Sequence, residues 1–262
     1  MTAPITSIKI AEEISPTAVM IKGDGPPLVY LHGLLGPEWD GLLDDLSKKR
    51  RVHAPAHVGS DEPEELRHVD GIYDLVLYYD EVFDRLGLEQ FDLVGHSFGG
   101  MIAAEIAAAY PARVRKLALI DPLGLWRDDA PVEDYLMVPP DRQISLLLGD
   151  PARDDVKARL ALPEDPEAQL QEILHRITVM ASSAHFLWPI PERGLKKRLH
   201  RIRAETLILW GADDRLVPQV YARDFAAKIA KSEVAIIPGA GHAPQFDQRA
   251  AVSEKLLGFL AR

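Results

Sequence analysis

The chain of 262 residues contains no cysteine. Disulfide bonds, thiolate metal sites and a cysteine nucleophile are therefore excluded. It is also poor in positive charge, since 30 lysines and arginines face 40 acidic residues and give a formal net charge of -10. Nucleic acids and anionic membrane surfaces attract clustered positive charge, so we expect neither as a partner.

Long apolar runs are absent as well, and none reaches the length that crosses a membrane. The first ten residues, MTAPITSIKI, do not combine a basic start with an apolar core, so we expect no signal peptide. We find no internal repeat and no low-complexity linker. These absences predict a cytoplasmic protein, monomeric or homodimeric, whose partner is a small-molecule substrate.

Short apolar runs alternate with amphipathic stretches along most of the chain. Such runs are typical of buried strands, and period-two alternation predicts two more strands in ITSIKI and TAVMIK near the N-terminus. The later strands are expected at 28–31, 50–55, 91–95, 116–121, 206–210 and 233–238, and helices at 73–88, 101–110 and 248–261. This order predicts an α/β fold with a mostly parallel sheet covered by helices on both faces.

The alternation stops between residues 122 and 205, where the pattern is helical. We expect this stretch to be a helical cap, or lid, inserted into a core formed by 1–121 and 206–262. It would leave from the carboxyl end of a strand, where such sheets bind their ligands. One basic run within it, RGLKKRLHRIR (193–203), has apolar residues at helical spacing. We expect an amphipathic helix with a solvated basic face there, the alternative being a cation that attracts an acidic substrate.

A G-x-S-x-G motif, Gly95-His96-Ser97-Phe98-Gly99, lies between a predicted strand and an alanine-rich helix. That is the setting of a nucleophile elbow, in which glycines permit a very tight turn. The Ser97 hydroxyl would project at the end of the strand, above a helix N-terminus that favours developing negative charge. A serine needs a base to act as a nucleophile. His96 is adjacent and would point elsewhere, so we expect it to pack or hydrogen-bond beside the site.

His242 is the best candidate for the base. It follows a predicted strand in AIIPGAGHAPQFD (235–247), and Gly239 and Gly241 let the loop turn sharply. A loop after the last strand can reach the same edge of the sheet as Ser97. A serine and a histidine on neighbouring loops predict nucleophilic catalysis without a cofactor or a metal.

A carboxylate is then needed to orient the imidazole and stabilise its protonated form. Asp213 and Asp214 follow the predicted strand at 206–210, and Asp121 ends the strand at 116–121. Each of these positions lies at the carboxyl end of a strand, where the nucleophile is also expected. The three acids are therefore all candidates.

The chain order of serine, acid and histidine resembles that of the serine enzymes of the α/β-hydrolase fold family, and the resemblance covers nearly the whole chain. In that family the loop after this strand often reads G-x-x-D-x-x-x-P, which Gly211, Asp214 and Pro218 match. The resemblance implies that Asp214 is the catalytic acid, Asp213 a turn or capping neighbour, and Asp121 a rival. It also implies an eight-stranded, mostly parallel sheet.

A second family motif, H-G-x-x-G, is matched by residues 32–36, HGLLG. The resemblance implies that the backbone N–H groups of Leu34 and Phe98 form the oxyanion hole, and that Leu35 lines an apolar pocket. Further pocket candidates are the large side chains of the insertion, namely Trp126, Tyr135, Phe186 and Trp188. One departure is APAHVGSDEP (54–63), where many relatives have a segment like A-P-D-x-P-G-x-G-x-S.

The function that these features favour is hydrolysis of a small, largely apolar carboxylic ester through an acyl-enzyme. An alternative is hydrolysis of a C–C bond in a vinylogous keto acid; such enzymes often have tryptophan after the catalytic histidine, where this chain has Ala243. A lactonase or a thioesterase would have the same motifs. A protein of another class, a ligand receptor that keeps an intact triad, stays open too.

Overall fold

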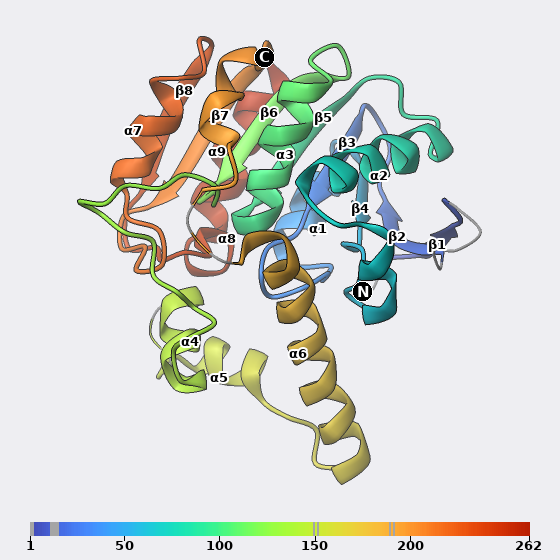
Figure 1. Ribbon diagram of the computed structural model, residues 1–262, viewed down its shortest axis with the longest axis vertical. Coiled ribbons are helices and arrows are strands. Elements are labelled where there is room, and N and C mark those ends of the chain that lie inside the picture. The colour runs from blue at the N-terminus through green and yellow to red at the C-terminus, as the bar shows by residue number, and fades with distance from the viewer. Residues whose placement is uncertain (1–2, 11–15, 149, 151, 189, 191) are drawn as a thin grey trace.

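The computed structural model describes residues 3–10, 16–148, 150, 152–188, 190 and 192–262, and it is built around one eight-stranded sheet (Figure 1). The strands are β1 (Ile5–Ile8), β2 (Thr17–Lys22), β3 (Pro27–Leu31), β4 (Arg51–Pro55), β5 (Phe91–His96), β6 (Val114–Ile120), β7 (Glu205–Gly211) and β8 (Ser232–Ile237). Their order in the sheet is β1-β2-β4-β3-β5-β6-β7-β8. Among these described strands, β2 pairs antiparallel with both β1 and β4, and all the other pairs are parallel. The predicted fold class is confirmed.

Helices cover both faces of this sheet. One face packs against α1 (Gly41–Ser47) and α9 (Arg249–Ala261), and the other against α2 (Ile72–Arg85), α3 (Ser97–Ala109) and α7 (Val220–Ala226). Alternate residues of a strand serve the two cores: in β7, Leu207 and Leu209 face the first, and Ile208 and Trp210 the second. Burial on both faces explains why the central strands are mostly apolar.

The stretch between β6 and β7 contains α4 (Pro140–Leu147), α5 (Asp154–Leu160) and α6 (Pro166–Leu187), and its described residues form no strand. The longest of these, α6, is capped at its N-terminus by Asp165, whose side chain accepts a hydrogen bond from the Ala168 N–H (2.9 Å). Its C-terminal half is buried against the core at Val179 and Phe186, whereas its N-terminal half extends away from the sheet (Figure 1). A lid function for this stretch stays a prediction.

The basic run at 193–203 differs from the expected amphipathic α-helix. It forms two short 3-10 helices, η2 (Leu195–Lys197) and η3 (Leu199–Arg201), that join at Arg198. The Arg198 guanidinium bonds both oxygens of the buried Glu105 on α3 (2.6 and 2.7 Å). This ion pair, located where η2 meets η3, holds residues 193–203 along α3. A regular helix with all its cations in solvent would leave the Glu105 carboxylate buried without a charged partner.

One further 3-10 helix, η1 (Pro63–His68), and the four-residue α8 (Pro244–Asp247) complete the elements that surround the carboxyl edge of the sheet. None of the helices in the described part of the chain is long and apolar enough to cross a lipid bilayer.

Candidate active site

The chain passes directly from β5 into α3 at Ser97, with no intervening loop. The φ of Ser97 is 56°, in the left-handed region that side chains rarely adopt. The flanking glycines are required by close approach of the backbone: a Cβ on Gly95 would lie 2.3 Å from the Gly99 carbonyl oxygen, and one on Gly99 would lie 2.2 Å from that of Leu31. This geometry presents the Ser97 side chain at the carboxyl edge of the sheet, above the first turn of α3.

Three side chains from three loops form a hydrogen-bonded chain at this edge. The Ser97 hydroxyl donates to Nε2 of His242 (2.7 Å), and Nδ1–H of His242 donates to Oδ2 of Asp214 (2.9 Å). His242 lies between β8 and α8, and Asp214 follows β7. The structure thus brings together the serine, histidine and acid expected from the sequence. Their spacing meets the requirement for a nucleophile, a base and a group that orients the base.

The two adjacent aspartates after β7 have different surroundings. Asp214 Oδ1 accepts hydrogen bonds from the backbone N–H groups of Leu216 (2.8 Å) and Val217 (2.9 Å), which fixes the carboxylate and leaves Oδ2 for His242. Asp213 is exposed, and its backbone N–H bonds the Ala240 carbonyl (2.9 Å). The interaction of Asp213 therefore stabilises the loop, and Asp214 alone of this pair reaches the imidazole.

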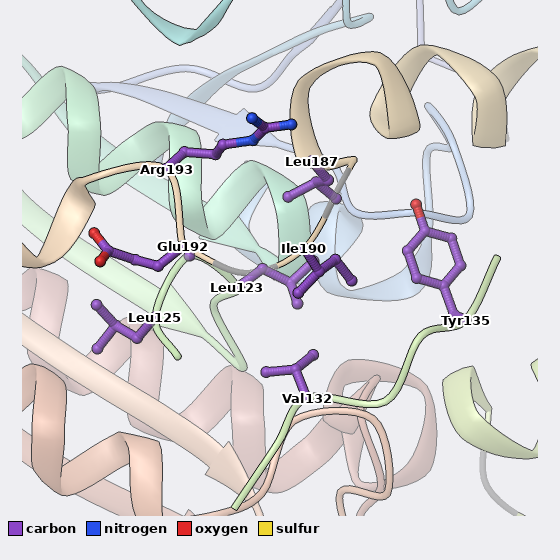
Figure 2. Close-up of a pocket in the computed structure, with 9 residues that line it drawn as sticks. Leu123, Leu125, Val132, Tyr135, Leu187, Ile190, Glu192 and Arg193 are labelled. Carbon is purple, nitrogen blue, oxygen red and sulfur yellow. The ribbon is translucent and has the colours of Figure 1, made fainter. Parts of the chain in front are cut away.

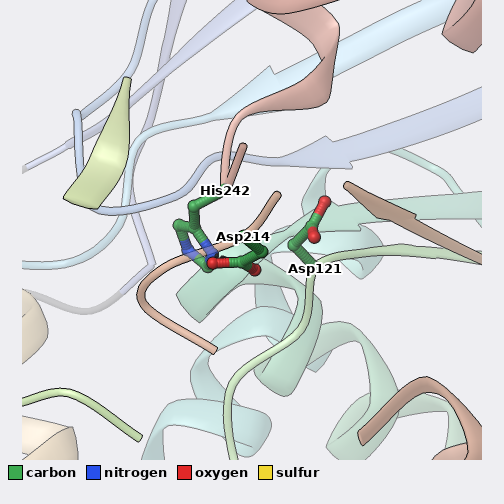
Figure 3. Close-up of side chains that lie close together, drawn as sticks. All are labelled: Asp121, Asp214 and His242. Carbon is green, nitrogen blue, oxygen red and sulfur yellow. Dashed lines mark hydrogen bonds and ion pairs between the residues drawn. The ribbon is translucent and has the colours of Figure 1, made fainter. Parts of the chain in front are cut away.

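The third candidate acid, Asp121, lies beside Asp214 (Figure 3). Ligand atoms of Asp121, Asp214 and His242 all lie within 4.8 Å of one another, a spacing that can hold a metal ion. The Nδ1 of His242 carries the proton that it donates to the Asp214 carboxylate, however, so it has no lone pair to offer a metal. The geometry agrees with catalysis by the serine and histidine, and the absence of a metal stays a prediction.

The expected oxyanion donors lie on two segments that meet at Ser97. Gly33 packs so closely that a Cβ there would lie 2.9 Å from the Ser97 Cβ and 2.5 Å from His96 Nδ1. Leu34 follows Gly33 and is buried, and Phe98 is in the first turn of α3, where backbone N–H groups have no acceptor within the helix. The role of these two N–H groups in binding an oxyanion stays a prediction.

Two buried histidines, His32 and His57, fix the position of the segment that carries Leu34. This structural role was not predicted from the sequence. His57 donates from Nε2 to the His32 carbonyl (2.7 Å), its backbone N–H donates to His32 Nε2 (3.1 Å), and its Nδ1 accepts from the Tyr79 hydroxyl. His57 belongs to the segment 54–63 that departs from the family pattern. Within that segment His57 occupies a position that the family pattern leaves open, so the motif does not predict its clamp on the neighbouring loop.

Burial lowers the pKa of His57 from its ordinary value of 6.5 to about 4, and lowers that of His32 well below 6.5. Between pH 4 and 6.5 the unfolded chain thus binds a proton at His57 that the folded chain does not, so this residue makes stability rise with pH. We expect His57→Gln to reduce the slope of unfolding free energy against pH by about 1 kcal/mol per pH unit near pH 5. Urea unfolding of both proteins from pH 4.5 to 7.5 measures the slopes, and equal slopes would contradict the assignment.

His96 also has a definite place, beside the site as expected. Its Nε2–H donates to the backbone carbonyl of His242 (2.7 Å), and its Nδ1 accepts from the Gln245 amide (3.2 Å). Burial lowers the pKa of His96 to about 3, so the ring is neutral at physiological pH. His96, the residue before Ser97, therefore anchors the loop that carries His242.

The five pocket candidates are dispersed. Phe186 stacks on Phe98 (6.0 Å between centroids), and Trp188 lines a surface hollow of about 370 Å³ with Met137. Leu35 is partly exposed, and the Trp126 indole bonds Asp128 (2.8 Å).

Tyr135 lines a cavity of about 30 Å³ together with Leu123, Gly124, Leu125, Val132, Leu187, Ile190, Glu192 and Arg193 (Figure 2). Such a volume has room for about one water molecule. Ser97 and His242 are both fully buried, so a substrate can reach the serine only after the residues above it move. A pocket role for all five candidates stays a prediction.

The chain belongs to the alpha/beta hydrolase fold family, whose model matches residues 26–248. It is 30% identical to a 2-hydroxymuconate semialdehyde hydrolase of Pseudomonas sp. (strain CF600), over 100% of this chain and 97% of that one. It is 26% identical to an uncharacterized carboxylesterase nap of Bacillus subtilis (strain 168), over 97% and 86%. The solved structure of a 2-hydroxy-6-oxo-6-phenylhexa-2,4-dienoate hydrolase from Rhodococcus sp. strain RHA1 has the same fold, with a TM-score of 0.71, 21% identity and full coverage of both chains. This chain is thus a hydrolase.

Proposed function

We propose that this hydrolase uses Ser97 as nucleophile, His242 as general base and Asp214 as the acid that orients His242. The observation that supports this is the continuous chain of hydrogen bonds from the Ser97 hydroxyl to the Asp214 carboxylate. His242 Nε2 takes the hydroxyl proton as Oγ attacks a carbonyl carbon, and Asp214 stabilises the imidazolium that forms. The N–H groups of Leu34 and Phe98 would stabilise the negative oxygen of the tetrahedral intermediate.

Collapse of that intermediate expels the leaving group, which takes the proton from His242, and leaves an acyl group on Ser97. Water then attacks the acyl carbon while His242 Nε2 accepts its proton. Collapse of this second intermediate expels Ser97 Oγ, which takes the proton back from Nε2, and the acid is released. Every proton in this cycle moves through one nitrogen. Because Nδ1–H is held by Asp214, the ring keeps the tautomer that presents Nε2 to the serine.

For the substrate, we propose a small vinylogous keto acid that is cleaved at a C–C bond. The support is the full-length similarity, at 30% identity, to a 2-hydroxymuconate semialdehyde hydrolase. The dienol first moves its hydroxyl proton to the carbon next to the keto group, which makes that carbon saturated. Attack on the keto carbonyl then breaks the adjacent C–C bond, and its electron pair passes into the conjugated keto acid, which leaves as a stabilised enolate and takes the proton from His242. The sequence had favoured an ester, and the relatives favour the C–C substrate.

A carboxylic ester is the second candidate, and a specific residue favours it. Ala243 follows His242 where C–C hydrolases of this family often have tryptophan, and the chain is also similar to a carboxylesterase. An ester makes smaller demands on the enzyme, since an alkoxide is a better leaving group than a carbon atom and needs no conjugated system to accept electrons.

A comparison of the two substrate classes tests the proposal. We expect kcat/KM for a 2-hydroxy-6-oxo-2,4-dienoate to exceed that for a short alkyl ester by at least about tenfold, equivalent to about 1.4 kcal/mol of transition-state binding. Loss of the dienoate absorbance and release of acid from the ester measure the two rates. A reversed ratio would identify the chain as an esterase. The cytoplasmic location and the monomeric or dimeric state stay predictions.

A further inference from the structure

Asp121 is a fully buried acid that the proposed mechanism does not use. It follows β6 and has a φ of 42°; only it and Ser97, among the non-glycine residues that the structure describes, have positive φ. Its Oδ1 accepts the Gly211 N–H (2.9 Å), and its Oδ2 is buried without a hydrogen-bond partner in the protein other than the neighbouring carboxyl group. A left-handed backbone at a non-glycine residue and a buried carboxyl oxygen without a donor both cost folding free energy. Their presence at Asp121, beside Ser97 and His242, indicates a functional role.

The donors around the two carboxyl groups can be accounted for one by one. Asp214 takes two backbone N–H groups on Oδ1 and His242 Nδ1–H on Oδ2, and Asp121 takes one backbone N–H on Oδ1. None of these donors lies between the two carboxyl groups, although their oxygens approach within 4.8 Å. Two buried carboxylates at that separation repel each other strongly unless one of them holds a proton.

The other groups that face Asp121 add no compensating cation. They are Asp214 from the β7 loop, His242 from the β8 loop and Asp247 from α8, and the charge of Asp247 is already paired with Arg153. Burial is the main factor that raises the pKa of Asp121, and the charge of Asp214 raises it further. Asp214 has three donors to stabilise its charge and Asp121 has one, so the proton belongs on Asp121.

We propose that Asp121 is a protonated carboxylic acid whose Oδ2–H donates to the Asp214 carboxylate and so positions Asp214 against His242. Asp121 contacts neither the substrate nor the proton on His242 Nδ1, so it is a positioning residue. The proposal rests on the proposed roles of Asp214 and His242. In this arrangement the two carboxyl groups together carry one negative charge, which balances the imidazolium that forms during catalysis. Asp121, which the sequence analysis treats as a rival of Asp214, then acts through Asp214.

Asp121→Asn and Asp121→Gly test this together. Asparagine tolerates a left-handed backbone and keeps both an acceptor for the Gly211 N–H and an uncharged donor for Asp214; glycine keeps the backbone but removes the side chain. We expect Asp121→Asn to retain kcat within a few fold and to leave the acid limb of the kcat/KM profile unmoved. We expect Asp121→Gly to lower kcat by about tenfold, the effect of one lost hydrogen bond, with little change in KM.

An ionised Asp121 predicts a different result. Asp121→Asn would then remove a negative charge next to His242, and the acid limb of the profile would shift to lower pH; a wild-type kcat in Asp121→Gly would equally overturn the positioning role. Infrared spectroscopy decides the protonation state without any activity assay. Wild-type protein at pH 7 should show the C=O stretch of a protonated carboxyl group that Asp121→Asn lacks, and identical spectra would contradict the proposal. If Asp214→Asn were fully active while this band was present, the proposed function would fail and the proton on Asp121 would stand.

Discussion

Replacement of Ser97 by alanine is expected to lower kcat/KM by on the order of 10⁵-fold, because it removes the only atom that can form the acyl-enzyme. The Ser97 Oγ is 2.7 Å from His242 Nε2, so the lost group is the one whose proton the base receives. Alanine keeps the Cβ and can occupy the same left-handed backbone, so the fold should persist. Steady-state rates on the preferred substrate, with circular dichroism and thermal unfolding as checks of folding, measure the effect.

Ser60→Ala is a matched control, since Ser60 is also fully buried but its hydroxyl has no hydrogen-bond partner in the protein. Its activity should stay close to wild type. A Ser97→Ala protein with more than a few per cent of wild-type activity would show that another group attacks the substrate. Multiple turnovers by wild-type protein would in turn exclude the receptor alternative, which predicts tight binding with no more than a single turnover.

Asp214→Asn should have the second-largest effect, a decrease in kcat of about 10⁴-fold, as for the equivalent change in a chymotrypsin-like triad. Asparagine fits the space, but its oxygen satisfies the Leu216 and Val217 N–H groups, which leaves the amide nitrogen facing His242. Nδ1 must then accept a hydrogen bond, and Nε2 carries the proton. In that tautomer the ring cannot take a proton from Ser97.

Asp213→Asn provides the control, because Asp213 is the neighbouring residue of the same type and is exposed. We expect it to keep wild-type kcat and KM within about twofold, as for most exposed substitutions. A severe defect in Asp213→Asn with a mild one in Asp214→Asn would overturn the assignment of the acid and leave the fold unaffected.

The sheet could be predicted because its strands are short apolar runs separated by turn residues, and burial on both faces enforces that composition. The choice of Asp214 as the acid rested on the G-x-x-D-x-x-x-P spacing, and the structure gives a physical reason for that spacing. In a turn, an aspartate side chain can accept hydrogen bonds from the backbone N–H groups of the second and third residues after it. Asp214 does so with Leu216 and Val217. The Asp214 carboxylate thereby faces His242 at the edge of the sheet, whereas Asp213 is exposed to solvent.

The remaining features depend on contacts that a local pattern does not contain. The pairing of Arg198 with Glu105 links residues 93 positions apart, and it lies where two 3-10 helices replace the expected α-helix. The clamp of His57 on His32 depends on two loops that meet only in the folded sheet. Asp121 could be identified as a candidate acid, but its position beside Asp214, as a second carboxyl group, appears only once β6 and β7 are paired.

The most direct test of the central claim is to find which residue a fluorophosphonate modifies. Such a probe forms a covalent bond with a serine hydroxyl only where a base activates it and an oxyanion hole receives its oxygen. Intact-protein mass spectrometry followed by peptide mapping should find one adduct per chain, on Ser97, at a rate that falls strongly in Asp214→Asn and is unchanged in Asp213→Asn. No adduct on a protein that turns over substrate, or an adduct on another residue with Ser97 unmodified, would contradict the account.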